Sequence, residues 1–159
     1  MMRYVILMAL LLCLPVRGES WQVVGGGSVG VTLGPEKLND PSFESSVMNA
    51  PWSRSETTPT IEDGDLVFTA GSYKNAFQQA IKMAAPLVVG ETYRVTVDKE
   101  PNTGIALRVG SFSGTTCSLP LAGGVQSCDF TASSTAFEIK TSSGPVTATL
   151  HSISVKKIP

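Results

Sequence analysis

The chain has 159 residues, and its twelve Lys and Arg stand against thirteen Asp and Glu, for a formal net charge of −1. This length fits one domain with an appendage, and the balanced charge, with no basic cluster, gives nucleic-acid binding no electrostatic support. Small, hydroxylated and β-branched residues dominate the body, which is typical of an all-β domain with many turns.

The first eighteen residues are similar to a secretory signal peptide. Arg3 supplies a positive start, Tyr4 to Leu14 form a short apolar run, and Pro15 ends it. Such a run is too short to span the ~30 Å of hydrocarbon in a bilayer comfortably. Cys13 leaves a lipid anchor open, although the small residues expected before a lipidated cysteine are absent. A third alternative is burial of this segment against a neighbour in an assembly such as a virus particle.

Residues 19–33 contain the run Gly25-Gly26-Gly27-Ser28, which is typical of a flexible linker. The valines on either side of this run make the segment more apolar than a plain tether. An arm that docks on a neighbouring protein is therefore an equal alternative. We expect three parts: a signal-peptide-like segment over 1–18, a linker or docking arm over 19–33, and a folded domain over 34–159.

From residue 65 onward, segments alternate apolar and polar residues with period two, the pattern of a half-buried strand. Turn residues such as Asp63-Gly64 and Val89-Gly90 separate these segments. No segment shows a sustained helical period. About eight short strands predict an all-β fold, an antiparallel β-sandwich. The predicted strands span 65–70, 76–83, 92–98, 105–109, 136–141 and 147–155.

The same alternation predicts the residues of the core. In the strand over 76–83, it places Phe77 and Ile81 on one face and Gln78 on the other. The predicted core consists of Leu66, Phe68, Phe77, Ile81, Tyr93, Val95, Val97, Leu107, Val109, Phe130, Phe137, Ile139 and Ile153.

Two cysteines in the body, Cys117 and Cys128, flank a segment rich in Gly and Leu. In an exported chain they favour a disulfide that closes a hairpin. The loss of chain entropy predicts a stabilisation of about 3 kcal/mol for a loop of this length. Two free thiols are the alternative for a chain assembled in the cytosol. We do not expect metal binding here, because neither the spacing nor the single His151 supplies a ligand set.

Residues suited to catalysis do not form a recognisable pattern. His151 is the only histidine, and its polar position in the last strand favours a surface residue over a member of a catalytic triad. Glu62, Asp63 and Asp65 bracket a glycine turn, where solvated carboxylates are the ordinary interpretation and a glycosidase pair the unusual one. The sequence lacks a phosphate-binding loop, Rossmann glycines and a Cys-x-x-Cys pair. We therefore expect no enzymatic activity.

A distinctive stretch, Leu38-Asn39-Asp40-Pro41-Ser42-Phe43-Glu44, is followed by Trp52, and the chain closes with Ile153-Ser154-Val155. This arrangement resembles the carbohydrate-binding, galactose-binding-like jelly-roll modules over residues 34–158. The resemblance implies a jelly-roll sandwich that binds or builds and does not catalyse.

In that family, the glutamate of the Phe-Glu pair commonly helps to hold a structural calcium ion, and here that residue is Glu44. The family's acidic ligand near the last strand is replaced by Ser152, which would weaken the site because calcium prefers several carboxylate oxygens. The resemblance implies no other cofactor.

The resemblance also implies glycan binding through aromatic platforms and planar polar side chains. Trp52 has a core position as its alternative, and the adjacent Gln78 and Gln79 point to opposite faces, so only one can line a site. The aromatic content of 7% argues against an extended polysaccharide platform. The candidate glycan ligands are Trp52, Tyr73, Asn75, Gln78, Gln79, Tyr93 and Arg94.

Modules of this kind recur as decoration and fibre parts of bacteriophage particles and within secreted bacterial proteins. We expect a non-catalytic structural or adhesive module of a phage virion, docked on other proteins through its N-terminal arm. Display in many copies would raise weak contacts with surface glycans to useful avidity. The alternative is a free secreted carbohydrate-binding protein. Both hypotheses place the protein outside the cell.

Overall fold

The described part of the chain is built of β-strands. The computed structural model describes residues 31–44, 48, 51–54, 59–69, 75–79, 82–104, 106–141 and 147–159. These residues form ten strands and no α-helix. The strands are β1 (Ser53–Arg54), β2 (Thr60–Glu62), β3 (Asp65–Phe68), β4 (Asn75–Gln78), β5 (Thr92–Lys99), β6 (Leu107–Ser111), β7 (Thr116–Ser118), β8 (Gly124–Thr131), β9 (Phe137–Thr141) and β10 (Ala148–Lys157).

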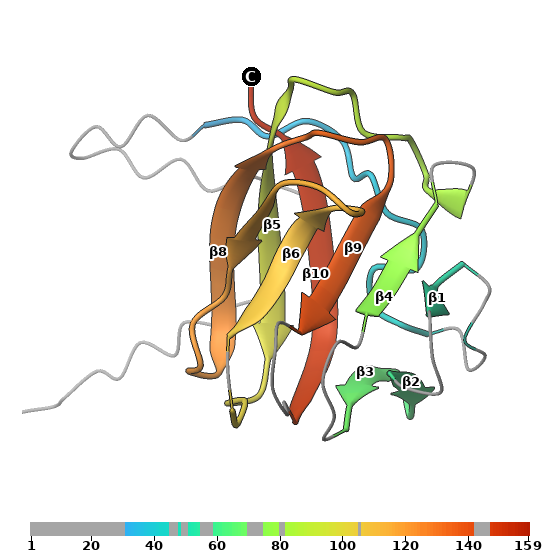
Figure 1. Cartoon of the computed structure of the whole chain (residues 1–159), viewed down its shortest axis with the longest axis vertical. Helices are drawn as coiled ribbons and strands as arrows, with labels where there is room; N and C mark the ends of the chain where they lie inside the picture. The colour runs from blue at the N-terminus through green and yellow to red at the C-terminus, as the bar shows by residue number, and fades with distance from the viewer. Residues whose placement is uncertain are drawn as a thin grey trace, which may run out of the picture. The chain divides into compact units, whose positions relative to one another are not determined.

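The strands form two antiparallel sheets of five strands each, which lie one behind the other in Figure 1. Sheet A has the order β2-β3-β10-β5-β8, and sheet B has the order β1-β4-β9-β6-β7. If the strands from β3 to β10 are numbered one to eight, sheet A has the order 1-8-3-6 after β2. Sheet B then has the order 2-7-4-5 after β1. This is the order of a jelly roll, and the predicted antiparallel β-sandwich is confirmed.

Alternation decides which residues lie between the sheets. Along β5, burial alternates strictly, with Tyr93, Val95 and Val97 inward. A register shift between Leu150 and Ser152 lets β10 bury both Leu150 and Ile153, which an unbroken alternation would place on opposite faces. The predicted core residues that are buried are Leu66, Phe68, Tyr93, Val95, Val97, Leu107, Val109, Phe130, Phe137, Ile139 and Ile153.

The prediction for Phe77 is wrong, because this residue lies half-buried on the outer face of sheet B. The inward residues of β4 are Ala76 and Gln78, both 0% exposed. A glutamine is rarely found inside, and here its amide is satisfied: Nε2 donates to the Asn39 carbonyl at 2.5 Å, and Oε1 accepts from the Asn39 amide at 3.1 Å. Ile81 lies outside the described residues.

The stretch before β1 packs its apolar side chains into the core. Asp40 and Phe43 adopt positive φ values of 49° and 56°, and in this turn Leu38 and Phe43 are 2% and 0% exposed. The rings of Phe43 and Trp52 lie 5.3 Å apart, and Trp52 Nε1 donates to the Asp40 carbonyl at 3.0 Å. The residues that carry the family resemblance in the sequence therefore pack together here as part of the hydrophobic core.

Cys117 and Cys128 form a disulfide, with Cα atoms 6.1 Å apart. The predicted hairpin is wrong, however, because Cys117 lies in β7 at the edge of sheet B and Cys128 lies in β8 at the edge of sheet A. Much of the segment predicted as a loop is the strand β8, which pairs with β5. The disulfide therefore joins the edges of the two sheets and closes one side of the sandwich.

A buried lysine holds the loops at one end of the sandwich. Lys99 ends β5 and is 1% exposed. Its ammonium donates to Asn102 Oδ1 at 2.7 Å and to the Ala122 carbonyl at 2.5 Å. Burial lowers the pKa of Lys99. These contacts connect the loop after β5 with the loop before β8.

Residues 1–30 lie outside the described residues, and so the signal-peptide-like segment and most of the predicted arm stay predictions. Among the residues that are described, no helix is long and apolar enough to cross a bilayer.

Candidate functional site

The outer face of sheet B combines aromatic, acidic and basic side chains from three neighbouring strands. Strand β9 pairs with β4 on one side and with β6 on the other. Opposite Glu138 of β9 lie Phe77 of β4 and Gly110 of β6, and opposite Lys140 of β9 lies Arg108 of β6. Residues opposite each other in neighbouring strands point to the same face, so these side chains share one surface.

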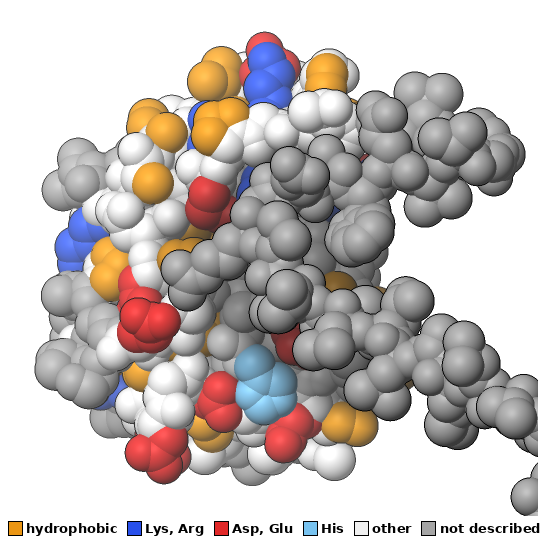
Figure 2. Space-filling model, turned by 180° about the vertical axis from the view of Figure 1, so that it is seen from behind, with side chains coloured by type: hydrophobic (Ala, Val, Ile, Leu, Met, Phe, Trp, Pro, Cys, Tyr) orange, Lys and Arg blue, Asp and Glu red, His pale blue; other side chains and the backbone are white. Residues whose placement is uncertain are grey.

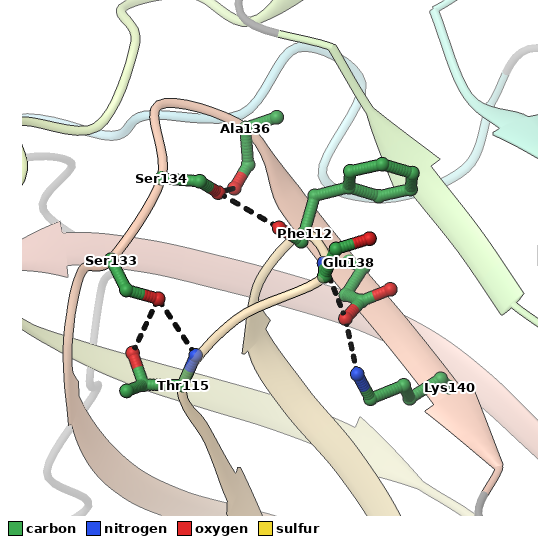
Figure 3. A network of polar contacts seen from close by, with 8 residues as sticks. Phe112, Thr115, Ser133, Ser134, Ala136, Glu138 and Lys140 are labelled. Atoms are coloured by element: carbon green, nitrogen blue, oxygen red, sulfur yellow. Dashed lines mark hydrogen bonds and ion pairs between the residues drawn. The ribbon is translucent and has the colours of Figure 1, made fainter.

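Glu138 is almost inaccessible to water although it lies on the outer face, with 2% of the residue exposed. The turn 112–115 between β6 and β7 covers it, and the amide of Ser113 donates to Glu138 Oε1 at 3.0 Å. Lys140 Nζ donates to the same oxygen at 2.5 Å, as Figure 3 shows. Within the described part of the chain, Oε2 has no hydrogen-bond donor. Oε2 is therefore the acceptor of this carboxylate that no described residue occupies.

Gly110 lets the turn fold tightly over the sheet. A Cβ atom at this position would lie 2.4 Å from the carbonyl oxygen of Thr115, much closer than such atoms approach. Within the turn, the Ser111 amide donates to that same carbonyl at 2.8 Å. Any other residue at position 110 would push the turn away from Glu138.

Serine hydroxyls tie the turn 112–115 to the segment between β8 and β9. Ser133 Oγ accepts from the Thr115 amide at 2.8 Å, and Ser134 Oγ donates to the Phe112 carbonyl at 3.0 Å (Figure 3). The Ser133 amide in turn donates to Ser111 Oγ at 2.9 Å. The fold itself therefore holds the turn above Glu138.

An aromatic pair lies beside the buried carboxylate. The ring centroids of Phe77 and Phe112 are 4.7 Å apart, and the rings are tilted by 47°. Both residues are half-buried. This is an apolar surface next to a hydrogen-bond acceptor.

Basic side chains flank the aromatic pair and the carboxylate. Arg108 is exposed, and the side chain of Lys140 is 28% exposed. On the β1 side, Lys82 Nζ donates to Ser53 Oγ at 3.0 Å, and Ser53 lies opposite Phe77. We call this surface the sheet B patch; it consists of Phe77, Lys82, Arg108, Phe112, Glu138 and Lys140.

The glycan candidates taken from the sequence do not come together. Trp52, Gln78 and Tyr93 are each 0% exposed and lie in the core. The Tyr93 hydroxyl accepts from the Val88 amide at 2.9 Å. The core alternative for Trp52 agrees with this burial.

The other candidates lie on different surfaces. Asn75 is in β4, where its backbone is opposite Lys140, and Gln79 is exposed just after that strand. Arg94 lies on the outer face of sheet A, where its guanidinium donates to both carboxylate oxygens of Asp129 at 2.8 and 2.9 Å. This hydrogen-bonded pair raises the pKa of Arg94 and lowers the pKa of Asp129. Tyr73 lies outside the described residues.

Glu44, the predicted calcium ligand, is exposed, and its amide donates to Asp40 Oδ1 at 2.8 Å. The described residues contain no group of three or more His, Cys, Asp and Glu that could hold a metal ion. Calcium binding through Glu44 stays a prediction.

His151 lies on the outer face of sheet A, among the acidic side chains visible in Figure 2. Its Nδ1 is 2.9 Å from Asp65 Oδ1, and 42% of its side chain is exposed. The hydrogen bond with Asp65 raises the pKa of His151, and the negative charges of Asp98 and Glu100 add to this effect. Among the described residues, no hydroxyl or thiol is hydrogen-bonded to this imidazole.

With Phe137 and Ile139 predicted in the core, alternation leaves Glu138 and Lys140 on the outer face of their strand, but neither residue was a candidate ligand. Phe77 was predicted in the core, and Phe112 and Arg108 were not candidate ligands either. The available signal was a polar outer face on the strands predicted over 105–109 and 136–141. Joining these faces required the pairing of β9 with β4 and β6, which alternation within single strands does not encode.

No protein-family model matches the chain, and no curated protein matches it in sequence. Six solved chains are similar to it. Among them is a structure described as "CBM4 structure and function", which is 14% identical in sequence. The match covers 76% of this chain and 99% of that one, with a TM-score of 0.43.

Proposed function

We propose that this β-sandwich is a non-catalytic recognition module that binds a glycan on the sheet B patch. The observation that carries the proposal is Glu138, a buried carboxylate with one occupied and one available oxygen, beside the half-buried rings of Phe77 and Phe112.

Each part of the patch matches a part of a sugar. The apolar C–H face of a pyranose ring packs against an aromatic ring, which here is Phe77 or Phe112. Sugar hydroxyls donate to carboxylates and accept from ammonium groups, which here are Glu138 Oε2 and Lys140. Because the turn 112–115 is already held by serine hydroxyls, the acceptor is in position before a ligand arrives.

A glycan array followed by calorimetry on the positive sugars tests the proposal. The variants Phe112→Ala and Glu138→Gln should each weaken binding by about ten-fold or more, because one removes apolar contact and the other removes a charged acceptor. Asp129→Asn on sheet A is the matched control, since it neutralises a carboxylate away from the patch. Thermal melts of each variant show whether the fold is kept.

Two results would contradict the proposal. The first is a wild-type chain that binds no glycan on a broad array. The second is binding that Phe112→Ala and Glu138→Gln leave at the level of Asp129→Asn, because the ligand would then lie elsewhere on the molecule.

We further propose that the module acts outside the cell, on a phage particle or as a free secreted protein. The disulfide between Cys117 and Cys128 is compatible with export. The docking arm lies largely outside the described residues, so its role rests on the sequence. An intact mass of the mature chain separates the two cases: loss of residues 1–18 supports secretion, and a full-length chain found within particles supports assembly.

A further inference from the structure

The sheet B patch carries an excess of positive charge in a chain whose formal net charge is −1. Arg108 and Lys140 lie directly opposite each other on β6 and β9. The one acidic residue of the patch, Glu138, is buried and already accepts a hydrogen bond from Lys140. Among the described residues opposite each other on these two strands, the charge that no acid compensates is therefore that of Arg108.

The outer face of sheet A differs. Asp65 and Asp98 lie on its strands, and with Glu100 they surround His151, where Figure 2 shows acidic groups on both sides of the imidazole. Its cation Arg94 is paired with Asp129.

Sheet A also contains two cations opposite each other, Arg94 and Lys156. Asp129 pairs with Arg94, whereas Glu36, opposite Lys156 on its other side, directs its carboxylate to backbone amides and to the Ser154 hydroxyl. Like charges that face each other across strands destabilise a sheet unless an opposite charge lies nearby.

On sheet B, the facing cations are Arg108 and Lys140. Glu138 compensates Lys140, whereas the guanidinium of Arg108 has neither a hydrogen bond nor an ion pair with any of the described residues. The residue opposite Arg108 on its other side is Ser118, which is uncharged. An exposed, unpaired arginine beside a second cation is suited to a planar anion, because the guanidinium binds a carboxylate through two parallel hydrogen bonds.

We infer that the ligand of the sheet B patch is an acidic glycan and that Arg108 binds the carboxylate of a uronic-acid-type sugar. This inference rests on the proposed function. Diagonal neighbours on paired strands are about 7–8 Å apart, and Arg108 and Glu138 are such neighbours. One sugar ring can therefore place its carboxylate on Arg108 and a hydroxyl on Glu138 Oε2, with its C–H face toward the phenylalanines.

Calorimetry with polygalacturonate, alginate, hyaluronan and polysialic acid tests the inference, with methyl-esterified polygalacturonate and dextran as uncharged polymers and dextran sulfate as a sulfated one. Arg108→Gln should weaken binding of the bound carboxylate polymer by about ten-fold or more. Lys156→Gln is the matched control: it removes the same charge from an opposed cation pair on sheet A and should leave binding unchanged.

Several outcomes would overturn the inference. Equal binding of the methyl-esterified polymer or of dextran sulfate would show that a carboxylate is not required. Equal effects of Arg108→Gln and Lys156→Gln would show that only net charge matters. Binding of neutral glycans alone, lost in Phe112→Ala and kept in Arg108→Gln, would overturn the acidic ligand and leave the proposed function standing. If no glycan binds at all, both proposals fail.

Discussion

The two outer faces of the sandwich are built from the same alternating pattern but treat their charged side chains differently. On sheet A, the pairs Arg94–Asp129 and His151–Asp65 lie in water, with 30–42% of each side chain exposed. On sheet B, the Glu138 side chain is 3% exposed although it also points away from the core. The difference comes from the turn 112–115, which folds over one face and has no counterpart among the described residues on the other.

An outward position in a strand is therefore not the same as an exposed position. Whether an outward side chain meets water depends on the loops that return over the sheet. A covered carboxylate loses its hydration, and burying its charge costs free energy unless the charge is paired. Its chemistry therefore differs from that of an exposed carboxylate.

Truncating one phenylalanine on each face of sheet B distinguishes its inner from its outer face. Phe137→Ala should lower the free energy of unfolding by about 3–5 kcal/mol, because this residue is 0% exposed. Phe77→Ala should cost about 1 kcal/mol, mainly through the lost contact with Phe112. Urea unfolding measures both. Equal losses would mean that Phe77 belongs to the core after all.

The next prediction concerns the disulfide that joins the edges of the two sheets. Replacing both Cys117 and Cys128 by serine should lower the free energy of unfolding by about 3 kcal/mol, because the disulfide restricts the unfolded chain. Differential scanning calorimetry of this variant and of the reduced wild-type chain should give the same lowered Tm. An unchanged Tm after reduction, together with two titratable thiols, would show that the disulfide is not formed.

The covered pair Glu138–Lys140 can be compared directly with the exposed pair Arg94–Asp129. Glu138→Ala should lower the free energy of unfolding by about 1.5–3 kcal/mol, because the Ser113 amide and Lys140 both lose a charged acceptor. The Arg94–Asp129 pair on sheet A should contribute less, and its contribution should fall as salt is added, since water and ions screen it. Double-mutant cycles at low and high salt measure both pairs; equal coupling energies would contradict the covered state of Glu138.

The smallest effect is the titration of His151. Its pKa in the folded chain should lie above 6.5, because Asp65 holds the protonated ring. A raised pKa means that the pair stabilises the fold at pH values below that of the unfolded histidine and that this stabilisation is lost as pH rises through the folded pKa. An NMR titration checks the shift, and Asp65→Asn should lower it. An unchanged pKa in that variant would show that the contact is not formed in solution.

Much of the fold follows from local pattern. In β5 and β9, strict alternation gave both the strands and their inward faces. β4 was assigned the wrong face because its inward residues are Ala76 and Gln78, and only the contact with Asn39, far away in the sequence, makes a buried glutamine stable. β8 was missed because its Gly124-Val125-Gln126 start reads as a loop, and Lys99 gave no sign that backbone carbonyls would hold its ammonium.

The candidate site could be predicted less well than the fold. Phe77, Arg108, Glu138 and Lys140 lie on correctly or nearly correctly placed strands, yet the site exists only because β9 lies between β4 and β6 and the turn 112–115 lies on top. Residues that resemble a family's ligands, such as Trp52, turned out to be buried.

The order of residues along this chain therefore determined the class of architecture and the pairing of Cys117 with Cys128, because alternation and composition act over a few residues at a time. Which residues meet on one surface was decided only by the assembled sandwich. Contacts between segments distant in sequence decide which strands are neighbours, where a turn lies and whether a carboxylate is buried. The free energy of these contacts is shared among the segments, so no single segment determines it.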